Sequence, residues 1–291
     1  MNNTDELNDR FAIDGLAKFE VGEGGLTRLS ITTGKADATL YTHGAHVSHF
    51  RPGASEPILW MSAASRYESG KAIRGGVPIV FPWFGPRQDD PKAPSHGLVR
   101  TTEWSIETME RLATNDIRIS LATAVDKFSV VYRVTVGDSL GLDMRVTNES
   151  GEAVTFEQAF HTYLSVGDVR KIAVRGLEGA TKIDKLDQHA RKVQSDSPIT
   201  FASETDSVYV DTESTVQVED PLLGRTIEVQ KQGSRSTVVW NPWIDKSSRM
   251  ADFGDDEWTN MVCIESGNIA DNCVKLAPGQ SATMSTEIRV S

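Results

Sequence analysis

Several features that define common protein classes are scarce in this sequence of 291 residues. It has two cysteines, Cys263 and Cys273, and no Cys-X-X-Cys pair, so we expect neither a disulfide framework nor a cysteine-rich metal site. The most apolar run, at 77–84, is far shorter than the ~20 residues of a membrane helix and contains two prolines. The N-terminal segment is polar and acidic, unlike a secretory signal. We therefore expect a reduced, cytoplasmic protein that does not cross a membrane.

Positive charge is also in deficit. Lysine and arginine number 30 against 41 aspartates and glutamates, which gives a net charge of −11 with neutral histidines. Nucleic acids require a basic protein surface, so no nucleic-acid partner is expected. A small anionic ligand is compatible with this balance, because two or three local arginines outweigh a diffuse negative field. No hydrophobic patch suggests a subunit interface, and we expect a monomer.

Motifs for nucleotide binding or nucleophilic catalysis are missing: there is no P-loop, no Gly-X-Gly-X-X-Gly and no Gly-X-Ser-X-Gly. The triplet His43, His46 and His49 raises the question of a metal site. If 38–50 is one strand, His43 and His49 face one side and His46 the other, with no cysteine or carboxylate nearby to complete a site. We therefore expect no metal and no cofactor, which leaves acid–base chemistry.

Segments with a two-residue polarity period dominate what is present, and this period is typical of β-strands. Helical periodicity is weak, with modest candidates only at 5–19 and in a turn at 255–261. No linker or repeat divides the chain. We expect an all-β fold, one large antiparallel β-sandwich over 1–291, in which 1–19 is a peripheral N-terminal extension. The expected strands are 38–50, 117–124, 128–136, 141–148, 154–166, 225–230, 236–241, 261–266 and 283–290.

The expected strand at 154–166 carries three proton-active groups on one face. Alternation places Glu157, His161 and Tyr163 together, opposite a largely apolar face. His161 is either a half-buried histidine bonded to a backbone carbonyl or a general acid or base. An apolar environment and a nearby carboxylate shift an imidazole pKa in opposite directions, which can hold it near neutrality.

Glu265 lies near the end of the apolar segment "NMVCIESGN". A carboxylate inside a buried strand is costly unless it is paired, hydrogen-bonded or functional. It is therefore either a salt-bridged or edge-exposed glutamate, or the partner of His161 in an acid–base pair drawn from two distant strands.

The segment "IRGGVPIVFPWFGPR" at 73–87 is unusual for its paired glycines and three prolines, which make a long strand there unlikely to form. Such a loop could present Arg74 and Arg87 to a ligand, and Arg100 follows His96 in "SHGLVR". Arginine holds phosphate bidentately, although a loop arginine is usually only solvated. Trp83 and the segment "VVWNPW" at 238–243 offer aromatic faces for a sugar, or belong to the core.

Taken together and in order, several motifs resemble the aldose 1-epimerase (mutarotase) superfamily, and more narrowly its hexose-6-phosphate mutarotase branch. The resemblance covers roughly residues 20–290. It implies a β-supersandwich and the cofactor-independent interconversion of the α and β anomers of a hexose 6-phosphate. The motifs are "RGGVPIVFPWFGP", "HGLVR", "FEQAFHTYLSVGDV", "SETDSVY", "VVWNPW" and "RMADFGDDEWTNMVCIESG".

The resemblance also implies roles for individual residues. His161 matches the family's general acid and Glu265 its general base, while Glu157 is expected to be a structural neighbour. Two positions depart from the pattern, since Ser95 replaces a frequent glutamine and Ser266 a usual proline. The implied substrate contacts are Arg74 and Arg100 to the phosphate, Asp206 to a hydroxyl, and His96, Ser95 and Trp240 in the same pocket.

Three alternatives use the same residues differently. A glycoside hydrolase needs two carboxylates flanking the scissile bond. Here only Glu265 is a clear candidate for one of them, and Asp206 is a weaker candidate for the other. A catalytically silent carbohydrate-binding module would keep the arginines and tryptophans without needing His161. A mutarotase for non-phosphorylated aldoses would not need Arg74 and Arg100 for a phosphate.

Overall fold

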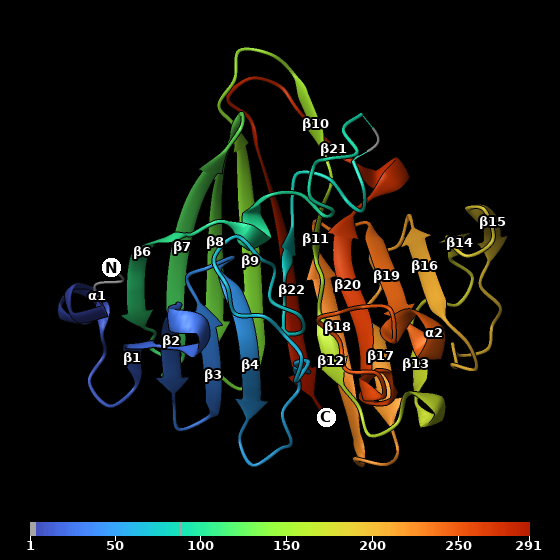
Figure 1. Cartoon of the computed structure of the whole chain (residues 1–291), viewed down its shortest axis with the longest axis horizontal. Coiled ribbons are helices and arrows are strands. Elements are labelled where there is room, and N and C mark those ends of the chain that lie inside the picture. Colours follow the sequence, from blue (N-terminus) through green and yellow to red (C-terminus); the bar gives the residue numbers. More distant parts are fainter. Residues whose placement is uncertain (1–3, 88) are drawn as a thin grey trace.

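The structure is a computed structural model that describes residues 4–87 and 89–291, and β-strands dominate it (Figure 1). The described chain contains 22 strands and two short α-helices, α1 (Thr4–Phe11) and α2 (Trp243–Ser247), which confirms the all-β expectation. The strands pair antiparallel throughout the named ladders. Short 3-10 helices lie in the connections, at Glu23–Gly25, Val99–Thr101, Val169–Lys171, Glu257–Asn260 and Ala270–Asn272.

Two eight-stranded sheets form the body of the molecule. The first has the order β13-β17-β18-β22-β9-β8-β7-β6. Its strands are β6 (Ser105–Arg111), β7 (Ile117–Val125), β8 (Phe128–Val136), β9 (Leu140–Asn148), β13 (Ala173–Arg175), β17 (Val216–Asp220), β18 (Arg225–Gln232) and β22 (Ser281–Val290). The second has the order β15-β14-β16-β19-β20-β11-β5, with β12 also paired to β20. Its strands are β5 (Ile79–Val80), β11 (Gln158–Phe160), β12 (Tyr163–Ser165), β14 (Thr181–Asp184), β15 (Ala190–Val193), β16 (Thr205–Val210), β19 (Ser236–Asn241) and β20 (Met261–Asn268).

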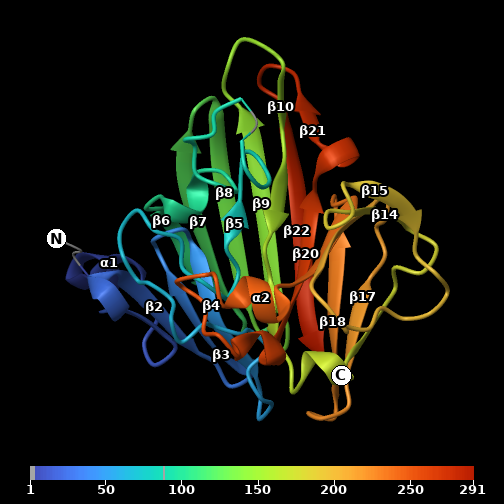
Figure 2. The same cartoon turned by 45° about the vertical axis from the view of Figure 1, so that its right-hand side comes forward.

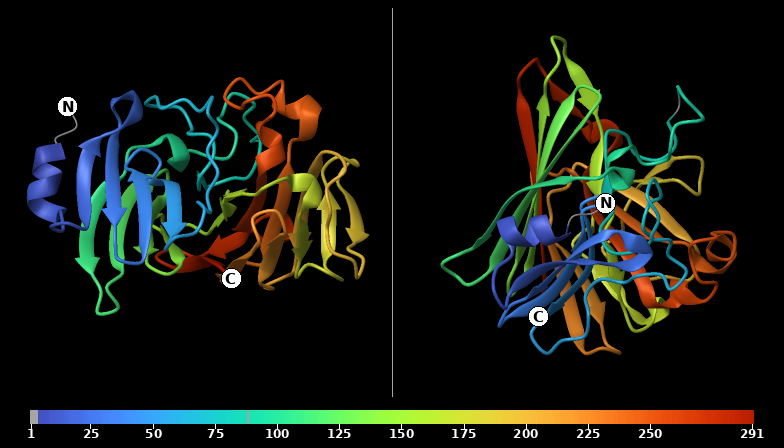
Figure 3. Two further views of the ribbon diagram at one scale, coloured as in Figure 1. Left: turned by 90° about the horizontal axis from the view of Figure 1, so that it is seen from below. Right: turned by 60° about the vertical axis from the view of Figure 1, so that its left-hand side comes forward.

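The second sheet lies over the β17–β18 half of the first. Arg225 of β18 donates to the carbonyl oxygen of Ser165 in β12, and Lys231 of β18 donates to that of Ser236 in β19. A smaller sheet in the order β1-β2-β3-β4 lies over the β6–β9 half (Figure 3). Its strands are β1 (Ala17–Val21), β2 (Thr27–Thr32), β3 (Ala36–Tyr41) and β4 (His46–Pro52), and a separate ladder joins β10 (Val154–Phe156) to β21 (Val274–Leu276).

The alternating strands form the core as their sequences predict. In β8, Phe128, Val130, Tyr132, Val134 and Val136 are buried, while the residues between them are half-buried or exposed. Each large apolar side chain removed from water contributes roughly 1.5–3 kcal/mol to the free energy of unfolding. The period-two segments 128–136, 141–148 and 283–290 therefore become central strands of the first sheet.

Strand β20 differs because every residue from Met261 to Asn268 is buried, including Glu265. It is a central strand, paired with β19 on one side and with β11 and β12 on the other. In Figure 2, α2 and its flanking loops lie in front of the centre of the molecule. A carboxylate on such a strand is removed from bulk water, and the edge-exposed interpretation of Glu265 is wrong.

Two expected strands are broken. The segment 38–50 forms β3 and β4 joined by a tight turn, where a Cβ on Gly44 would lie 2.6 Å from the carbonyl oxygen of Arg100. His43 and His49 therefore do not share one strand face: His43 Nε2 contacts the carbonyl oxygen of Lys71 at 2.7 Å, and His49 pairs with Thr39. The segment 154–166 is likewise divided into β10, β11 and β12.

The remaining predictions about regular structure hold in part. The helix expected at 5–19 ends at Phe11, and Ala17–Phe19 belongs to β1. The loop at 73–87 contains only the two-residue strand β5, as its prolines predict. Helix α2, which follows Pro242, was not predicted. Among the described residues, no helix has the length and apolar character needed to cross a membrane.

Candidate active site

The break between β11 and β12 places His161 opposite Glu265. Phe160 pairs with Ser266 before the break and Tyr163 with Cys263 after it, so the same register continued across the break matches His161 to Glu265. Directly opposed residues of antiparallel strands bring their Cβ atoms to about 4.5–5.5 Å. Accordingly, His161 Nδ1 lies 3.4 Å from Glu265 Oε1.

The row of proton-active groups expected at 157–163 is only partly formed. His161 and Tyr163 do share a face, with their rings stacked at 4.7 Å and an angle of 7°. Glu157, however, accepts hydrogen bonds from the backbone N–H groups of Phe84 and Ala270. It ties two loops together, and this contact agrees with its expected structural role.

Aromatic rings enclose the histidine. Trp240 of β19 meets His161 edge-on at 5.9 Å, and His96 meets it edge-on at 5.5 Å. Only 7% of His161 and 1% of Glu265 is exposed to solvent. Within the described part of the chain, His161 Nδ1 and Glu265 Oε2 make no hydrogen bond, although both atoms are buried. Buried polar atoms normally have partners, so these two atoms leave hydrogen-bonding capacity unused inside the candidate site.

Burial shifts the pKa values of the two groups in opposite directions. It lowers the pKa of His161 well below its ordinary value, and His96, Arg100 and Arg74 add to the fall. Burial raises the pKa of Glu265 well above its ordinary value; Lys185 and Arg100 oppose the rise, and Asp206 adds to it. Both shifts favour the uncharged forms, in which the pair shares one acidic proton, and such coupled groups suit reversible proton transfer.

Two arginines flank the pair. Arg74 donates from Nη1 to the hydroxyl of Tyr163 at 2.8 Å and forms a bidentate ion pair with Asp252, at 3.2 Å from Nε and 3.0 Å from Nη2. Burial and the neighbouring charge of Arg74 lower the pKa of Arg100 to about 10. Two adjacent guanidinium groups with a single carboxylate partner form a site that suits an anion.

His96 and Ser95 approach the site from the loop before β6. The His96 backbone has φ of +65°, and its Nδ1 accepts a hydrogen bond from the Gly85 N–H at 3.3 Å. Burial lowers the pKa of His96 to about 3, so the ring is neutral and carries its proton on Nε2. Ser95 holds Arg100 through its carbonyl oxygen, which accepts from Nη2 at 2.7 Å.

Asp206 extends the same sheet face. It pairs with Trp240 in the register of β16 and β19, and Trp240 pairs with Cys263 in β20. Its carboxylate lies 3.1 Å from Lys185 Nζ and 3.6 Å from Lys246 Nζ. Neither these lysines nor Asp252 is predicted from the sequence, because they lie in loops and a short helix without a periodic signal.

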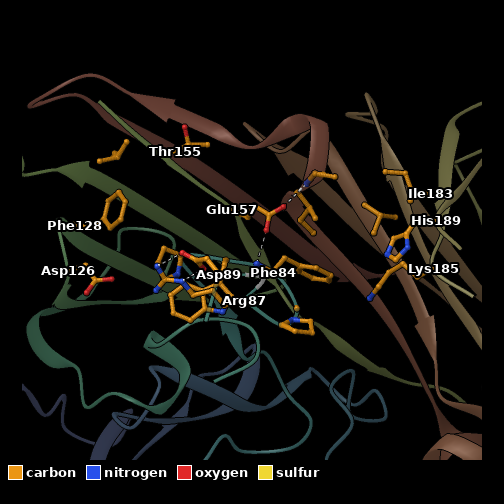
Figure 4. A pocket seen from close by; sticks show the side chains of 18 of the residues that line it. Phe84, Arg87, Asp89, Asp126, Phe128, Thr155, Glu157, Ile183, Lys185 and His189 are labelled. Atoms are coloured by element: carbon orange, nitrogen blue, oxygen red, sulfur yellow. Dashed lines mark hydrogen bonds and ion pairs between the residues drawn. The ribbon is translucent and has the colours of Figure 1, made fainter. Parts of the chain in front are cut away.

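A cavity of about 1160 Å³ adjoins the site through Phe84 and Lys185, both of which are labelled in Figure 4. Phe84 and Lys185 line it and also approach the site, since the Phe84 ring meets His96 at 4.9 Å and Lys185 contacts Asp206. His161 and Glu265 are not among its described lining residues. Arg87 belongs to this cavity, pairs with Asp89 and lies over the Trp83 ring.

Comparisons with known proteins identify the family of this chain. The family described as Aldose 1-epimerase matches residues 27–289. A protein of Escherichia coli K12 named "Putative glucose-6-phosphate 1-epimerase" is 32% identical over 262 residues, which are 87% of each chain. A protein of Cenchrus ciliaris with the same name is 32% identical over 264 residues, covering 84% of this chain and 78% of its own.

Solved structures share the fold. The crystal structure of a "putative mutarotase" from Salmonella typhimurium matches with a TM-score of 0.89 and 26% identity, over 99% of this chain and 98% of its own. A galactose mutarotase-like protein from Clostridium acetobutylicum matches with a TM-score of 0.70 and 13% identity, over 94% and 98%. The chain therefore belongs to the aldose 1-epimerase family and is an isomerase of the mutarotase type that acts on a sugar.

Proposed function

We propose that this mutarotase interconverts the α and β anomers of a hexose 6-phosphate, with His161 and Glu265 as the proton-transfer groups. The observation that carries the proposal is their opposition in the strand register, at 3.4 Å and nearly free of solvent. Mutarotation must move one proton at the anomeric hydroxyl and one at the ring oxygen. Both oxygens are bonded to the same carbon, so the two catalytic groups must lie close together.

The reaction needs only these two groups. Glu265 removes the proton of the anomeric hydroxyl while His161 protonates the ring oxygen, and the C1–O5 bond breaks to give the open aldehyde. Rotation about C1–C2 presents the other carbonyl face. The ring closes as the 5-hydroxyl attacks C1, His161 takes back its proton, and Glu265 returns its proton to the new anomeric oxygen. Each such transfer contributes roughly 10²–10⁴-fold to the rate.

Arg74 and Arg100 support a phosphorylated substrate. A phosphate oxyanion would offset the repulsion between their guanidinium groups. It would also accept from the guanidinium N–H groups that do not already donate to Asp252 or Ser95. The charges of both arginines lower the pKa of His161, whereas only Arg100 of the two acts on Glu265. Neutralising the arginines therefore favours moving the shared proton from Glu265 to His161, which is the acid in the proposed mechanism.

The remaining candidate residues surround the position proposed for the sugar ring. In this proposal Asp206, held by Lys185, accepts from a sugar hydroxyl, and neutral His96 donates to the sugar from Nε2. Trp240 supplies an apolar edge beside His161, and Ser95 acts through Arg100.

The test is NMR magnetisation exchange between the anomers of glucose 6-phosphate near neutral pH, with plain glucose as the control substrate. We expect fast exchange of the phosphate sugar, reduced at least about 100-fold in His161→Ala and in Glu265→Gln. His189→Ala, which removes a histidine of the neighbouring cavity, is the matched control and should leave exchange unchanged. Binding without accelerated exchange would instead support a silent carbohydrate-binding module. Equal exchange of glucose and its phosphate would support a mutarotase for non-phosphorylated aldoses.

A further inference from the structure

The proposed reaction leaves one buried side chain beside the proton-transfer pair without a role. Cys263 precedes Glu265 by two residues on β20, so both side chains lie on the same face of the strand. It is fully buried, and neither it nor Cys273 forms a disulfide in the described chain. Cys263 pairs with Tyr163 in the register in which His161 opposes Glu265.

The three side chains converge on one point. Cys263 Sγ, a ring nitrogen of His161 and a carboxylate oxygen of Glu265 all lie within 4.8 Å of one another. A second observation is that His161 Nδ1 and Glu265 Oε2 are buried without a hydrogen bond among the described residues, so both atoms are available as ligands. A cation between the three atoms would use both.

The ligand set selects the type of cation. A thiolate, an imidazole and a carboxylate are the three groups that hold Zn²⁺, whose bonds of roughly 2.0–2.3 Å require ligand atoms about 3.3–3.8 Å apart. Side-chain rotations that close the present spacing by about an ångström would meet this requirement. Three protein ligands leave the fourth tetrahedral position open. As the ion binds, the Cys263 thiol and the Glu265 carboxyl release their protons to solvent. The resulting thiolate and carboxylate cancel the charge of the ion, which a low-dielectric site requires.

We propose that His161, Cys263 and Glu265 form a binding site for Zn²⁺ or a similar thiophilic divalent cation, and that occupancy inhibits the isomerase. The inhibitory part rests on the proposed function: a metal that takes the lone pairs of His161 and Glu265 removes both proton-transfer groups. The binding part stands on the cluster alone. A sugar and the ion would need the same two side chains, so they exclude each other.

The surrounding charges set limits on affinity. The positive charges of Lys185 and Arg100 lie close enough to Glu265 to lower its pKa, and that of Arg74 does the same to Cys263. These three cations repel a metal ion at the site. Asp206 acts on both residues in the opposite sense. An anion on the arginines would reduce the opposition, so inorganic phosphate should strengthen metal binding.

Binding is tested with Co²⁺, whose thiolate complexes absorb in the near ultraviolet. We expect the intact protein to show this thiolate-to-metal band at one Co²⁺ per chain, and Zn²⁺ to abolish it. The band should vanish in Cys263→Ser and Cys263→Ala and persist in Cys273→Ser, the matched control. Two variants at Cys263 are used, each checked by circular dichroism, because the site is tightly packed. No band in the intact protein, or the same band without Cys263, would overturn the proposal.

Inhibition is measured separately by anomer exchange. Zn²⁺ should slow exchange in the intact protein and in Cys273→Ser, and a chelator should restore it. Cys263→Ala should exchange at the intact rate without metal and resist Zn²⁺ at least about tenfold better. A Co²⁺ band in a protein without anomer exchange would reject the proposed function while retaining the metal site. Fast anomer exchange without a Co²⁺ band would support the proposed function and reject the metal site.

Discussion

His161 lies opposite Glu265 across the interrupted ladder between β11–β12 and β20, with Nδ1 3.4 Å from Oε1. On the other side of the strand, the His161 N–H donates to the carbonyl oxygen of Pro78, which continues the register of the β11–β5 pair by one residue. This bond fixes the loop at 73–87, which also carries Arg74, to the segment that carries His161.

The arginine pair should discriminate for the phosphate. Removing either Arg74 or Arg100 deletes charged hydrogen bonds worth roughly 1.5–3 kcal/mol each. We expect Arg74→Ala and Arg100→Ala each to lower kcat/KM for glucose 6-phosphate about 10- to 100-fold. Exchange rates at several substrate concentrations provide the measurement. Arg87→Ala, which alters an exposed arginine of the neighbouring cavity, is the control and should match the intact protein. Equal losses with glucose would contradict a phosphate role.

Glu265 should make stability depend on pH. Burial raises the pKa of Glu265, so between the unfolded and folded values the native state binds more protons than the unfolded state. The free energy of unfolding then falls as pH rises above about 4.5, and the loss continues to the raised pKa. Glu265→Gln removes this contribution because its amide does not titrate.

The measurement compares melting temperatures of the intact protein and Glu265→Gln at pH 5 and pH 8. The melting temperature of Glu265→Gln relative to that of the intact protein should rise with pH, so that the difference between variant and intact protein is more positive at pH 8 than at pH 5. Glu152→Gln alters an exposed glutamate and serves as the control. A difference in melting temperature that is the same at both pH values would show that folding does not shift the pKa of Glu265.

A side chain at Gly76, in the loop that carries Arg74, should lower the free energy of unfolding. Gly76 has φ of +58°, and a Cβ there would lie 2.2 Å from the carbonyl oxygen of Val47 and 2.8 Å from His46 Nε2. Gly76→Ala should therefore destabilise the protein by more than the ~1 kcal/mol of backbone strain alone. Gly85→Ala is the matched control, since φ is +72° but no described atom lies within 4 Å of the added Cβ. Chemical denaturation distinguishes the two; equal losses would mean that the backbone clash is relieved.

Much of the fold is readable in the sequence because half-buried strands impose a two-residue period. The segment 128–136 is predicted with the bounds that β8 has, and its five buried residues stand at alternate positions, as a two-residue period requires. The prediction fails at 38–50, where the chain turns at Gly44 and packs against the backbone of Arg100, which is distant in sequence. A local pattern does not report such a contact.

The candidate site is readable only in part, for the same reason. His161, Glu265 and Arg74 stand out because each is a polar group in an unusual local context. Their opposition depends on which strands pair and in what register, and no local pattern encodes this. Asp252 and Lys185 carry no signal of their own, since a charged residue in a loop is ordinarily solvated. Their importance appears only when Arg74 and Asp206 are seen beside them.

The hydroxyl of Tyr163 should act on catalysis through Arg74. It accepts a hydrogen bond from Arg74 Nη1 at 2.8 Å, while its ring stacks on His161. Tyr163→Phe keeps the stacked ring and removes only the bond that positions the arginine. We expect KM for glucose 6-phosphate to rise several-fold, with kcat within about twofold of the intact protein, because the proton-transfer pair is untouched.

Tyr132→Phe is the matched control for this change. The Tyr132 hydroxyl is buried in the core and has no hydrogen-bond partner among the described residues. Its removal should leave KM and kcat unchanged and raise the free energy of unfolding by about 1 kcal/mol, since an unsatisfied buried hydroxyl is costly. A fall in kcat in Tyr163→Phe with unchanged KM would place the hydroxyl in the proton transfers themselves. Because the two substitutions delete the same atom in different surroundings, their contrast isolates the effect of the Arg74 hydrogen bond.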